Sequence, residues 1–223
     1  MAPKKVALSW SGGKDSCMAM DKLARKGYEI ACLVTTVPKE IGRTFGHGER
    51  TEAIMAQANA LGIPVAFIAC TFDTYTADYE ARLKELATEF GFDAIAFGDL
   101  FLQEHRDWGM GVAEAVGIEA LYPLWMAPGD TLAALRTFVD SGYRAIVIRT
   151  SDRVFAESWL GRELGVSFYE DISSLGPAVC PMGEGGEYHT FVYDGPLFRR
   201  PVQFSKGAVV QLETTKRLEI VLG

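Results

Sequence analysis

The chain has 223 residues, enough for one domain with an appendage or for two small domains. Hydrophobic residues make up 48% and charged residues 23%, as in ordinary soluble globular proteins, and the net charge of −7 argues against a broad nucleic-acid-binding surface. No apolar run approaches the ~18 residues of a membrane span, and the first residues lack the apolar segment of a signal peptide. We therefore expect a cytoplasmic protein that makes no membrane contact.

Predicted strands and helices alternate over residues 4–150. We expect strands at 6–10, 28–37, 63–69, 93–97 and 143–148, an extended segment at 119–125, and helices from the first loop to residue 27 and at 49–61, 75–90, 103–116 and 131–141. This alternation predicts an α/β fold: a doubly wound, mostly parallel sheet with helices on both faces. Ligands of such sheets bind beyond the carboxyl ends of the strands.

The pattern changes after about residue 150. We expect a helix at 156–164, a turn-rich stretch at 176–190, and strands near 191–193, 202–204, 208–212 and 217–222. The last segments alternate polar and apolar residues, as the strands of an antiparallel ribbon do. We therefore divide the chain into an α/β domain, residues 1–150, and a smaller α+β region, residues 151–223.

The four cysteines do not form a motif. Cys17, Cys32, Cys70 and Cys180 are far apart, and no C-x-x-C is present. Neither a zinc knuckle nor a dithiol redox pair is indicated, and three histidines do not change this. Three of the cysteines lie in apolar patterns, where cysteine is usually a small buried hydrophobe.

The stretch Ser11-Gly12-Gly13-Lys14-Asp15-Ser16 lies between an apolar strand and a helical pattern. Adjacent glycines allow a sharp turn, and the first amides of the helix favour an anion, which Lys14 and the two serine hydroxyls would also attract. The spacing differs from the Walker motif and from G-x-G-x-x-G. It resembles the PP-loop, the SGGxDS signature of the ATP pyrophosphatases. An ordinary turn capped by Ser16 is the alternative.

A second polar cluster lies in the turn-rich stretch. It contains Glu184, Glu187, Tyr188, His189 and Thr190 among glycines, which allow a backbone to approach a ligand closely. On a strand, Glu187 and His189 would share one face, with Tyr188 and Thr190 on the other. The alternative is a surface hairpin whose polar groups are solvated.

Residues 183–191 and 194–198 resemble the C-terminal signature of the diphthine–ammonia ligase family, which makes diphthamide on translation elongation factor two. Phe97-Gly98-Asp99, Glu104-His105-Arg106 and Pro123-Leu124-Trp125 also match, so the resemblance covers nearly the whole chain. The family fold is similar to that of adenine nucleotide α-hydrolases. The implied reaction is ATP-dependent: a carboxylate is adenylylated, pyrophosphate leaves, and ammonia then displaces AMP. Most of the catalytic work is positioning and electrostatic stabilisation.

The resemblance also implies site residues. The nucleotide would be bound by Ser11, Gly12, Gly13, Lys14, Asp15, Ser16, Gly98 and Asp99. Mg²⁺, which prefers oxygen ligands, would be bound by Asp15 and Asp99. The acceptor and ammonium would be bound by Glu104, Glu184, Glu187, Tyr188, His189 and Thr190. The catalytic set would be Lys14, Asp15, Glu184, Glu187 and His189, with a deprotonated base releasing the nucleophilic ammonia.

The sequence leaves two possible roles open for each of two histidines, His47 and His105. His47 would contact phosphate or the acceptor, or would be a solvated loop residue. His105 would be catalytic, or would serve in a local ion pair or cap. Residues 43–48 resemble the shorter bacterial-type members of the family, for which a carboxylate acceptor other than diphthine is the alternative.

Two further functions compete with the ligase. One is another PP-loop enzyme, such as a tRNA thiolase or lysidine synthetase, which the acidic charge and the missing C-x-x-C disfavour. The other is a nucleotide-binding module that senses ATP without cleaving it. Release of pyrophosphate would distinguish the sensor from the enzymes. The sequence does not fix the oligomeric state, for which we consider a homodimer.

Overall fold

The computed structural model describes residues 3–39 and 42–223. Its centre is a five-stranded parallel sheet. The strand order is β3 (Val65–Cys70), β2 (Glu29–Pro38), β1 (Lys5–Ser9), β4 (Ala94–Ala96) and β5 (Glu119–Leu121). From β1 the chain adds strands first on one side of the sheet, β2 and β3, and then on the other, β4 and β5. The crevice beyond the carboxyl ends of β1 and β4, where this order reverses, is the expected ligand site.

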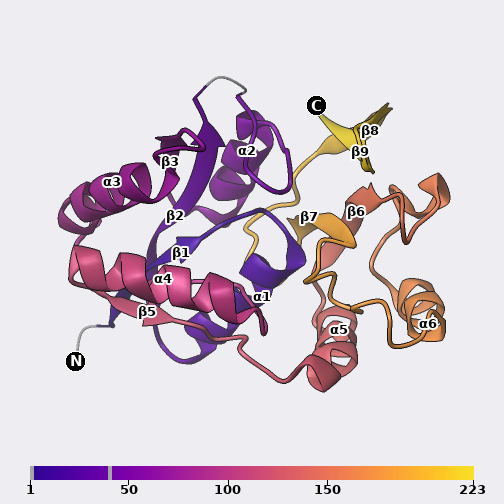
Figure 1. Ribbon diagram of the computed structural model, residues 1–223, viewed down its shortest axis with the longest axis horizontal. Helices are drawn as coiled ribbons and strands as arrows, with labels where there is room; N and C mark the ends of the chain where they lie inside the picture. The colour runs from indigo at the N-terminus through magenta and orange to yellow at the C-terminus, as the bar shows by residue number, and fades with distance from the viewer. Residues whose placement is uncertain (1–2, 40–41) are drawn as a thin grey trace.

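Helices cover both faces of this sheet, because successive strand residues point to opposite sides. Val6 and Leu8 pack in the core formed with α1 (Lys14–Arg25) and α2 (Thr51–Leu61). Ala7, between them, packs in the other core with α3 (Tyr75–Phe90) and α4 (Gln103–Val116) (Figure 1). The predicted α/β class and doubly wound sheet are confirmed.

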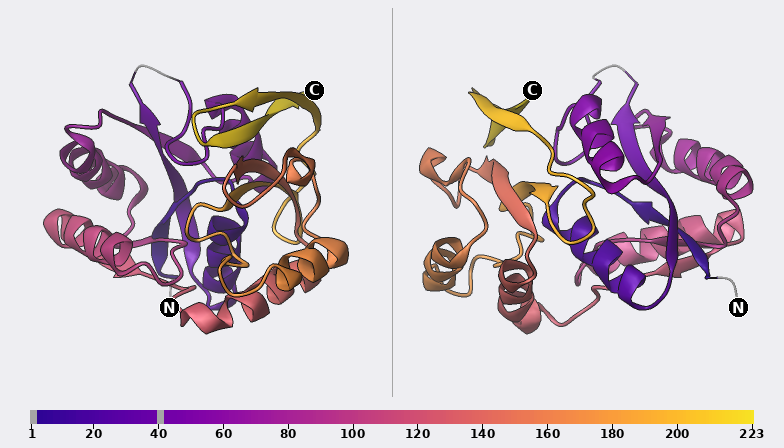
Figure 2. Two further views of the ribbon diagram at one scale, coloured as in Figure 1. Left: turned by 45° about the vertical axis from the view of Figure 1, so that its right-hand side comes forward. Right: turned by 180° about the vertical axis from the view of Figure 1, so that it is seen from behind.

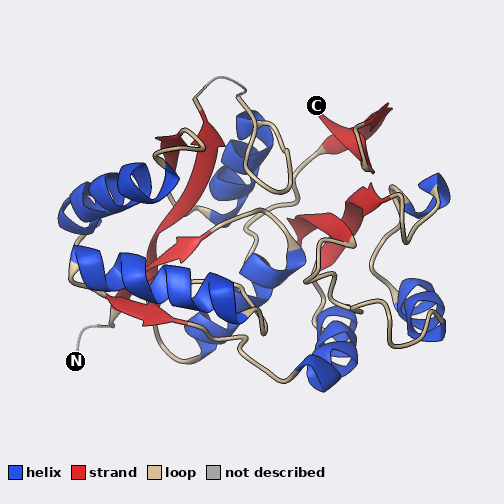
Figure 3. Cartoon of the chain, viewed as in Figure 1, coloured by secondary structure: helices blue, strands red, loops and turns tan. Residues whose placement is uncertain are grey.

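The rest of the chain forms a second, antiparallel sheet (Figures 2 and 3). Its order is β7 (Tyr188–Asp194), β6 (Arg144–Ser151), β9 (Thr215–Leu222) and β8 (Phe204–Gln211). Two helices, α5 (Thr131–Asp140) and α6 (Val166–Ser174), pack on one face, and α2 packs on the other. Helix α2 therefore lies between the two sheets and fixes their relative position.

Two expectations about this second part are wrong. The strand expected at 143–148 is β6, which pairs with β7 and β9 and not with the parallel sheet. The helix expected at 156–164 is one short 3₁₀ turn, η2 (Glu157–Trp159), followed by extended chain that returns along β6. Gly161, with φ of +75°, ends any helix there, and the helix forms instead at α6. Because η1 (Pro128–Asp130), α5 and β6 all belong with the second sheet, we propose that the division between the two parts lies before η1 and not at residue 150.

The exposure of the cysteines can be compared with the prediction from the sequence. Cys17, Cys32 and Cys70 are buried, as the sequence predicts, while Cys180 is partly exposed. In the described part of the chain, no helix has the length and apolar character needed to span a membrane.

Candidate active site

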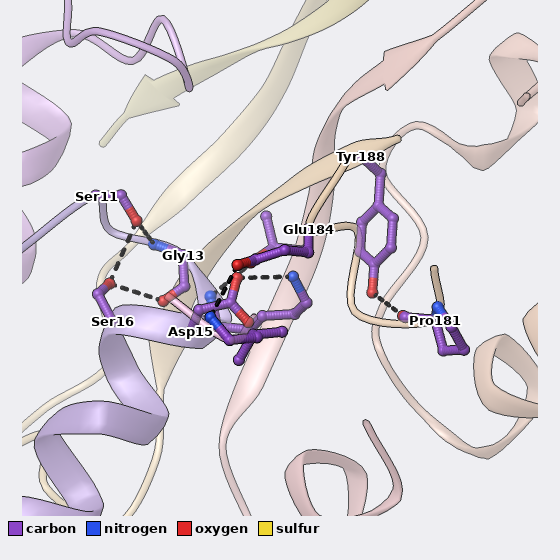
Figure 4. Close-up of polar contacts among 10 residues, drawn as sticks. Ser11, Gly13, Asp15, Ser16, Pro181, Glu184 and Tyr188 are labelled. Carbon is purple, nitrogen blue, oxygen red and sulfur yellow. Dashed lines mark hydrogen bonds and ion pairs between the residues drawn. The ribbon is translucent and has the colours of Figure 1, made fainter. Parts of the chain in front are cut away.

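The loop that follows β1 begins at the carboxyl end of that strand, where β4 is the neighbour in the sheet. Figure 4 shows the polar contacts among Ser11, Gly13 and Ser16 of this loop. The Gly13 N–H donates to Ser11 Oγ over 3.3 Å, and Ser16 Oγ donates to the Gly13 carbonyl over 3.0 Å. Gly12 has a φ of +80°, which a residue with a side chain rarely adopts. The two serines thus hold the turn in the shape that places the start of α1 at the crevice.

A second loop approaches the same helix start from β4. A Cβ at Gly98 would lie 3.0 Å from the Ser16 nitrogen and 3.1 Å from the Asp15 carbonyl carbon. Both contacts are with backbone, which cannot move aside as a flexible side chain can. A side chain at position 98 would therefore have to displace the start of α1 slightly, and Asp99 follows Gly98 at the edge of the crevice.

Lys14 does not project into the crevice. Its side chain is 3% exposed, and its Nζ lies 2.9 Å from Asp15 Oδ2 and 4.6 Å from the centre of the Tyr188 ring. The Tyr188 hydroxyl donates to the Pro181 carbonyl over 2.7 Å, which orients the ring under the ammonium (Figure 4). Lys14 therefore acts on the site as a buried positive charge beside Asp15.

The start of α1 is also tied to the second sheet. The Lys14 N–H donates to Thr190 Oγ1 over 2.9 Å, so this helix amide has a partner within the protein. The Val192 N–H donates to the Gly12 carbonyl over 2.9 Å. Strand β7 thus positions the loop, and Thr190 has a supporting role there.

Gln57 completes this link from helix α2. Its amide donates to the carbonyls of Gly12 and Val192 over 2.8 and 2.7 Å, and its oxygen accepts from Trp10 Nε1 over 3.1 Å. The side chain is fully buried. Gln57 is not among the residues predicted from the sequence, although a glutamine among Ile54, Ala58 and Leu61 on an apolar helix face is a signal of a buried polar role.

A cavity of about 210 Å³ lies over the loop. Its lining residues are Ser9, Ser11, Asp15, Ser16, His47, Gly98, Asp99, His105, Gly183, Glu184 and His189. We call it the phosphate cleft. It brings together the glycine loop, the Gly98–Asp99 turn and part of the C-terminal polar cluster.

Glu184 is the carboxylate of the C-terminal cluster that faces this cleft. Its Oε1 accepts from the Leu100 N–H over 2.8 Å (Figure 4). Burial raises the pKa of Glu184, the Leu100 N–H lowers it, and the negative charges of Asp15 and Asp99 raise it. Burial likewise raises the pKa of Asp15, against the opposing effect of Lys14. Several acidic groups thus share a small volume, which favours a cation or a proton among them.

His47 and His189 form one wall of the cleft. Their ring centres are 4.4 Å apart, and a Cβ at Gly13 would lie 2.6 Å from His47 Cε1. Burial and the charges of Lys14 and Arg149 lower the pKa of His47 to about 3. Burial, His47 and the same two charges lower the pKa of His189 well below its usual value. Both rings are therefore uncharged near neutral pH.

At the other end of the cleft, His105 Nδ1 lies 3.0 Å from Asp99 Oδ1. This pair also borders a second cavity of about 520 Å³, which we call the aromatic cavity. Its other lining residues are Ser9, Tyr75, Thr76, Phe97, Glu104 and Trp108. Glu104, which the resemblance assigns to the acceptor group with Glu187, lines this cavity, whereas Glu187 does not. The side chains of Tyr75, Phe97 and Trp108 were not expected in the site.

Glu187 faces a third cavity, of about 720 Å³, which we call the distal cavity. Its Oε1 accepts from the Cys180 N–H over 3.1 Å, while its Oε2 is buried with no hydrogen-bond partner among the described residues. Phe101, Leu132 and Ile172 are among the largely apolar neighbours. Glu184 and Glu187 therefore lie on different sides of their loop, and the single acceptor group expected from the sequence is divided.

Comparisons with known proteins identify the family of this chain. Residues 4–120 match the model of the diphthamide synthase N-terminal domain, and residues 130–219 match that of the C-terminal domain. The diphthine–ammonia ligase of Danio rerio is 26% identical over 219 residues, covering 86% of this chain and 83% of its own. That of Homo sapiens is 27% identical over 235 residues, covering 92% and 85%. Over 105 residues, 47% of this chain and 21% of its own, the argininosuccinate synthase of Halalkalibacterium halodurans is 30% identical. The chain belongs to the diphthamide synthase family.

Proposed function

We propose that this protein is an ATP-dependent amide-forming ligase that adenylylates a carboxylate, releases pyrophosphate and transfers ammonia to the acyl group. Its family and its relatives, which are named diphthine–ammonia ligases, support this class of enzyme. The observation that carries the proposal is the phosphate cleft, in which the glycine loop of one sheet and Glu184 of the other face the same space. A module that only senses ATP would not need that second set of groups.

The two adjoining cavities suggest how ATP would lie. The α-phosphate would sit at the start of α1, where the positive end of the helix dipole and the serine hydroxyls favour an anion. The base and ribose would occupy the aromatic cavity, which shares Ser9, Asp99 and His105 with the phosphate cleft. Tyr75 and Trp108 offer aromatic faces for a purine ring there.

Magnesium fits the donor set at Asp15. Asp15 Oδ1 is buried and has no hydrogen-bond partner in the described chain, while Oδ2 is paired with Lys14. Such an orphaned carboxylate oxygen suits Mg²⁺, which is usually bound by one or two carboxylates together with phosphate oxygens. We propose Asp15 as the first ligand and Asp99 as the second. The bound ion would neutralise charge on the phosphates.

The reaction then proceeds in two displacements. A carboxylate oxygen of the acceptor attacks the α-phosphorus, the bond to the β-phosphate oxygen breaks, and pyrophosphate leaves with the electron pair. Ammonia attacks the acyl carbon, and AMP leaves with the electrons of the broken bond. Ammonium must first lose a proton. We propose Glu184 as the group that accepts it, because its carboxylate faces the phosphate cleft and its pKa is raised, while the lowered pKa of His189 makes that ring a weaker base than an ordinary histidine.

The experiment is product analysis of ATP incubated with Mg²⁺, ammonium and a panel of carboxylates that includes a diphthine-bearing elongation factor. AMP and pyrophosphate that depend on both ammonium and one acceptor would support the ligase and identify its substrate. ADP and phosphate would exclude cleavage between the α- and β-phosphates. ATP binding without turnover on any acceptor would favour the sensor. Light scattering on the same samples would test our proposal of a homodimer, and fractionation of the source cells would test a cytoplasmic location.

A further inference from the structure

A row of basic side chains crosses the second sheet beside the phosphate cleft. His189 of β7 lies directly opposite Arg149 of β6, and Arg149 lies directly opposite Arg217 of β9. Directly opposed residues of antiparallel strands project on the same face. We call these three residues the basic row. Like charges in such a position are destabilising, so the pairing of Arg149 with Arg217 calls for a reason other than stability.

The charges of the row are incompletely neutralised. Arg217 lies 2.9 Å from Glu219, but this carboxylate also pairs with Arg43 at 2.7 Å and with Arg50 at 3.4 Å. Arg149 donates to two neutral oxygens, the Gly46 carbonyl and Thr215 Oγ1, and has no ion pair within residues 3–39 and 42–223.

Glu49 adds one more carboxylate to this neighbourhood, and its pKa is raised to about 7 by burial and by Glu219. This neighbourhood thus contains two carboxylates and four arginines: Glu49, Glu219, Arg43, Arg50, Arg149 and Arg217. The group carries an excess of at least two positive charges in a protein whose net charge is −7.

The row is continuous with the phosphate cleft. His189 lines the cleft and packs against His47, which in turn lies over Gly13 of the loop. A Cβ at Gly48 would lie 3.1 Å from Arg217 Nη1 and 3.8 Å from Arg149 Nη1, so the loop that carries His47 also touches both arginines. The order is therefore aromatic cavity, glycine loop, histidine pair and arginines.

We propose that Arg149 and Arg217 bind the terminal phosphates of ATP and hold the pyrophosphate that leaves. This inference rests on the proposed function and adds the residues that recognise the leaving group. Arginine forms bidentate hydrogen bonds with phosphate, and an anion between two opposed arginines removes their repulsion. The half-buried position of Arg149 beside a small cleft favours a small anion over an acidic protein surface.

The test compares binding of AMP, ATP and pyrophosphate by titration calorimetry, with Mg²⁺ present, in the wild-type protein and in Arg149→Gln. The matched control is Arg144→Gln, because Arg144 is an exposed arginine on the same strand that pairs with Glu163. We expect Arg149→Gln to lower the affinity for pyrophosphate and for ATP at least tenfold and to leave the affinity for AMP within twofold of the wild-type value. Arg149→Lys should recover part of the loss. Arg144→Gln should leave the affinities for AMP, ATP and pyrophosphate unchanged.

The outcomes separate this inference from the proposed function. Suppose that the wild-type protein forms AMP from ATP. If Arg149→Gln then weakens the binding of AMP as much as the binding of ATP, or leaves the binding of both ATP and pyrophosphate unchanged, the basic row is not the pyrophosphate site. If only binding of the acceptor protein is lost in Arg149→Gln, the row is a protein-docking surface and the inference is also wrong. If the wild-type protein binds no nucleotide at all, the proposed function itself fails. Thermal unfolding of each variant shows that it is folded.

Discussion

Replacing Gln57 by methionine tests whether the link between the two sheets holds the phosphate loop. Methionine keeps the length and flexibility of the side chain, so little packing is lost. It removes the two hydrogen bonds donated to Gly12 and Val192 and the one accepted from Trp10. The loop carbonyl of Gly12 keeps the Val192 N–H as a partner.

The expected loss of unfolding free energy follows from the buried polar groups that Gln57→Met leaves without a hydrogen-bond partner. The Trp10 indole N–H and the Val192 carbonyl lose the partner that Gln57 supplies, in surroundings where all three residues are buried. An unsatisfied buried group costs roughly 1–3 kcal/mol, so the free energy of unfolding should fall by roughly 2–6 kcal/mol. Since domains are stable by only about 5–15 kcal/mol, the variant should fold but with little margin.

The assay is urea unfolding at 25 °C followed by tryptophan fluorescence and circular dichroism, with ATP affinity measured on the same samples. Gln103→Met is the matched control, because Gln103 is exposed and, within the described chain, its side chain donates a hydrogen bond only to the nearby Asp107 on α4. We expect the control to change the unfolding free energy by less than about 0.5 kcal/mol. A loss of less than 1 kcal/mol in Gln57→Met would refute the reasoning, since it would mean that the network stabilises neither the sheets nor the loop.

Three further predictions concern the charges and the loop. The pKa of Glu49 is raised from 4.5 to about 7, so the folded state binds this proton more tightly than the unfolded state does. The stability that results is fully present below pH 4.5 and is lost as the pH rises through 7. Glu49→Gln should therefore remove about 3 kcal/mol of the pH dependence of the unfolding free energy between pH 4 and 8, and identical pH profiles of urea unfolding in the variant and the wild type would contradict this. Gly98→Ala should destabilise the protein by about 1–3 kcal/mol and weaken ATP binding, since the new methyl group meets backbone at 3.0 Å; unchanged calorimetric affinity would argue against the contact. Lys14→Ala should abolish ATP cleavage, because it removes the positive charge beside Asp15. Glu187→Gln should spare nucleotide binding, because Glu187 lies outside the phosphate cleft, and should block transfer, because the family resemblance assigns Glu187 to the acceptor site. Pyrophosphate release that persists in Lys14→Ala, or amide product that persists in Glu187→Gln, would contradict these expectations.

The sequence determined the local elements of the first part of the chain. Its strands and helices are marked by local signals that need no partner: buried apolar runs such as 6–8, apolar faces at helical spacing, and glycines that end helices, as Gly62 and Gly91 do with positive φ. The strand–glycine–helix order at residues 11–16 likewise predicts an anion site at a sheet edge before any contact is known. These features are local in sequence, and so a single sequence reveals them.

Pairing between distant segments was decided only by the tertiary structure. Nothing in residues 143–148 distinguishes a strand of the parallel sheet from β6 of the second sheet, because both are apolar and β-branched. The partner is chosen by where α5 and α6 bury their faces. The same holds for residues 156–164, whose apolar spacing suits a helix but whose backbone groups bond instead to β6.

The division of the C-terminal polar cluster has the same origin. Five polar residues within seven positions predict a site, but whether each faces a cavity depends on the turn at residues 183–187 and on what packs against it. Glu184 is drawn toward the phosphate cleft by the amide of Leu100, Glu187 toward the distal cavity by the amide of Cys180, and Tyr188 into the core beneath Lys14. The sequence thus determined which residue types carry the chemistry, while contacts across 80 or more positions, such as that between Glu184 and Leu100, decided where each group acts, since hydrogen bonds and burial depend on neighbours in space.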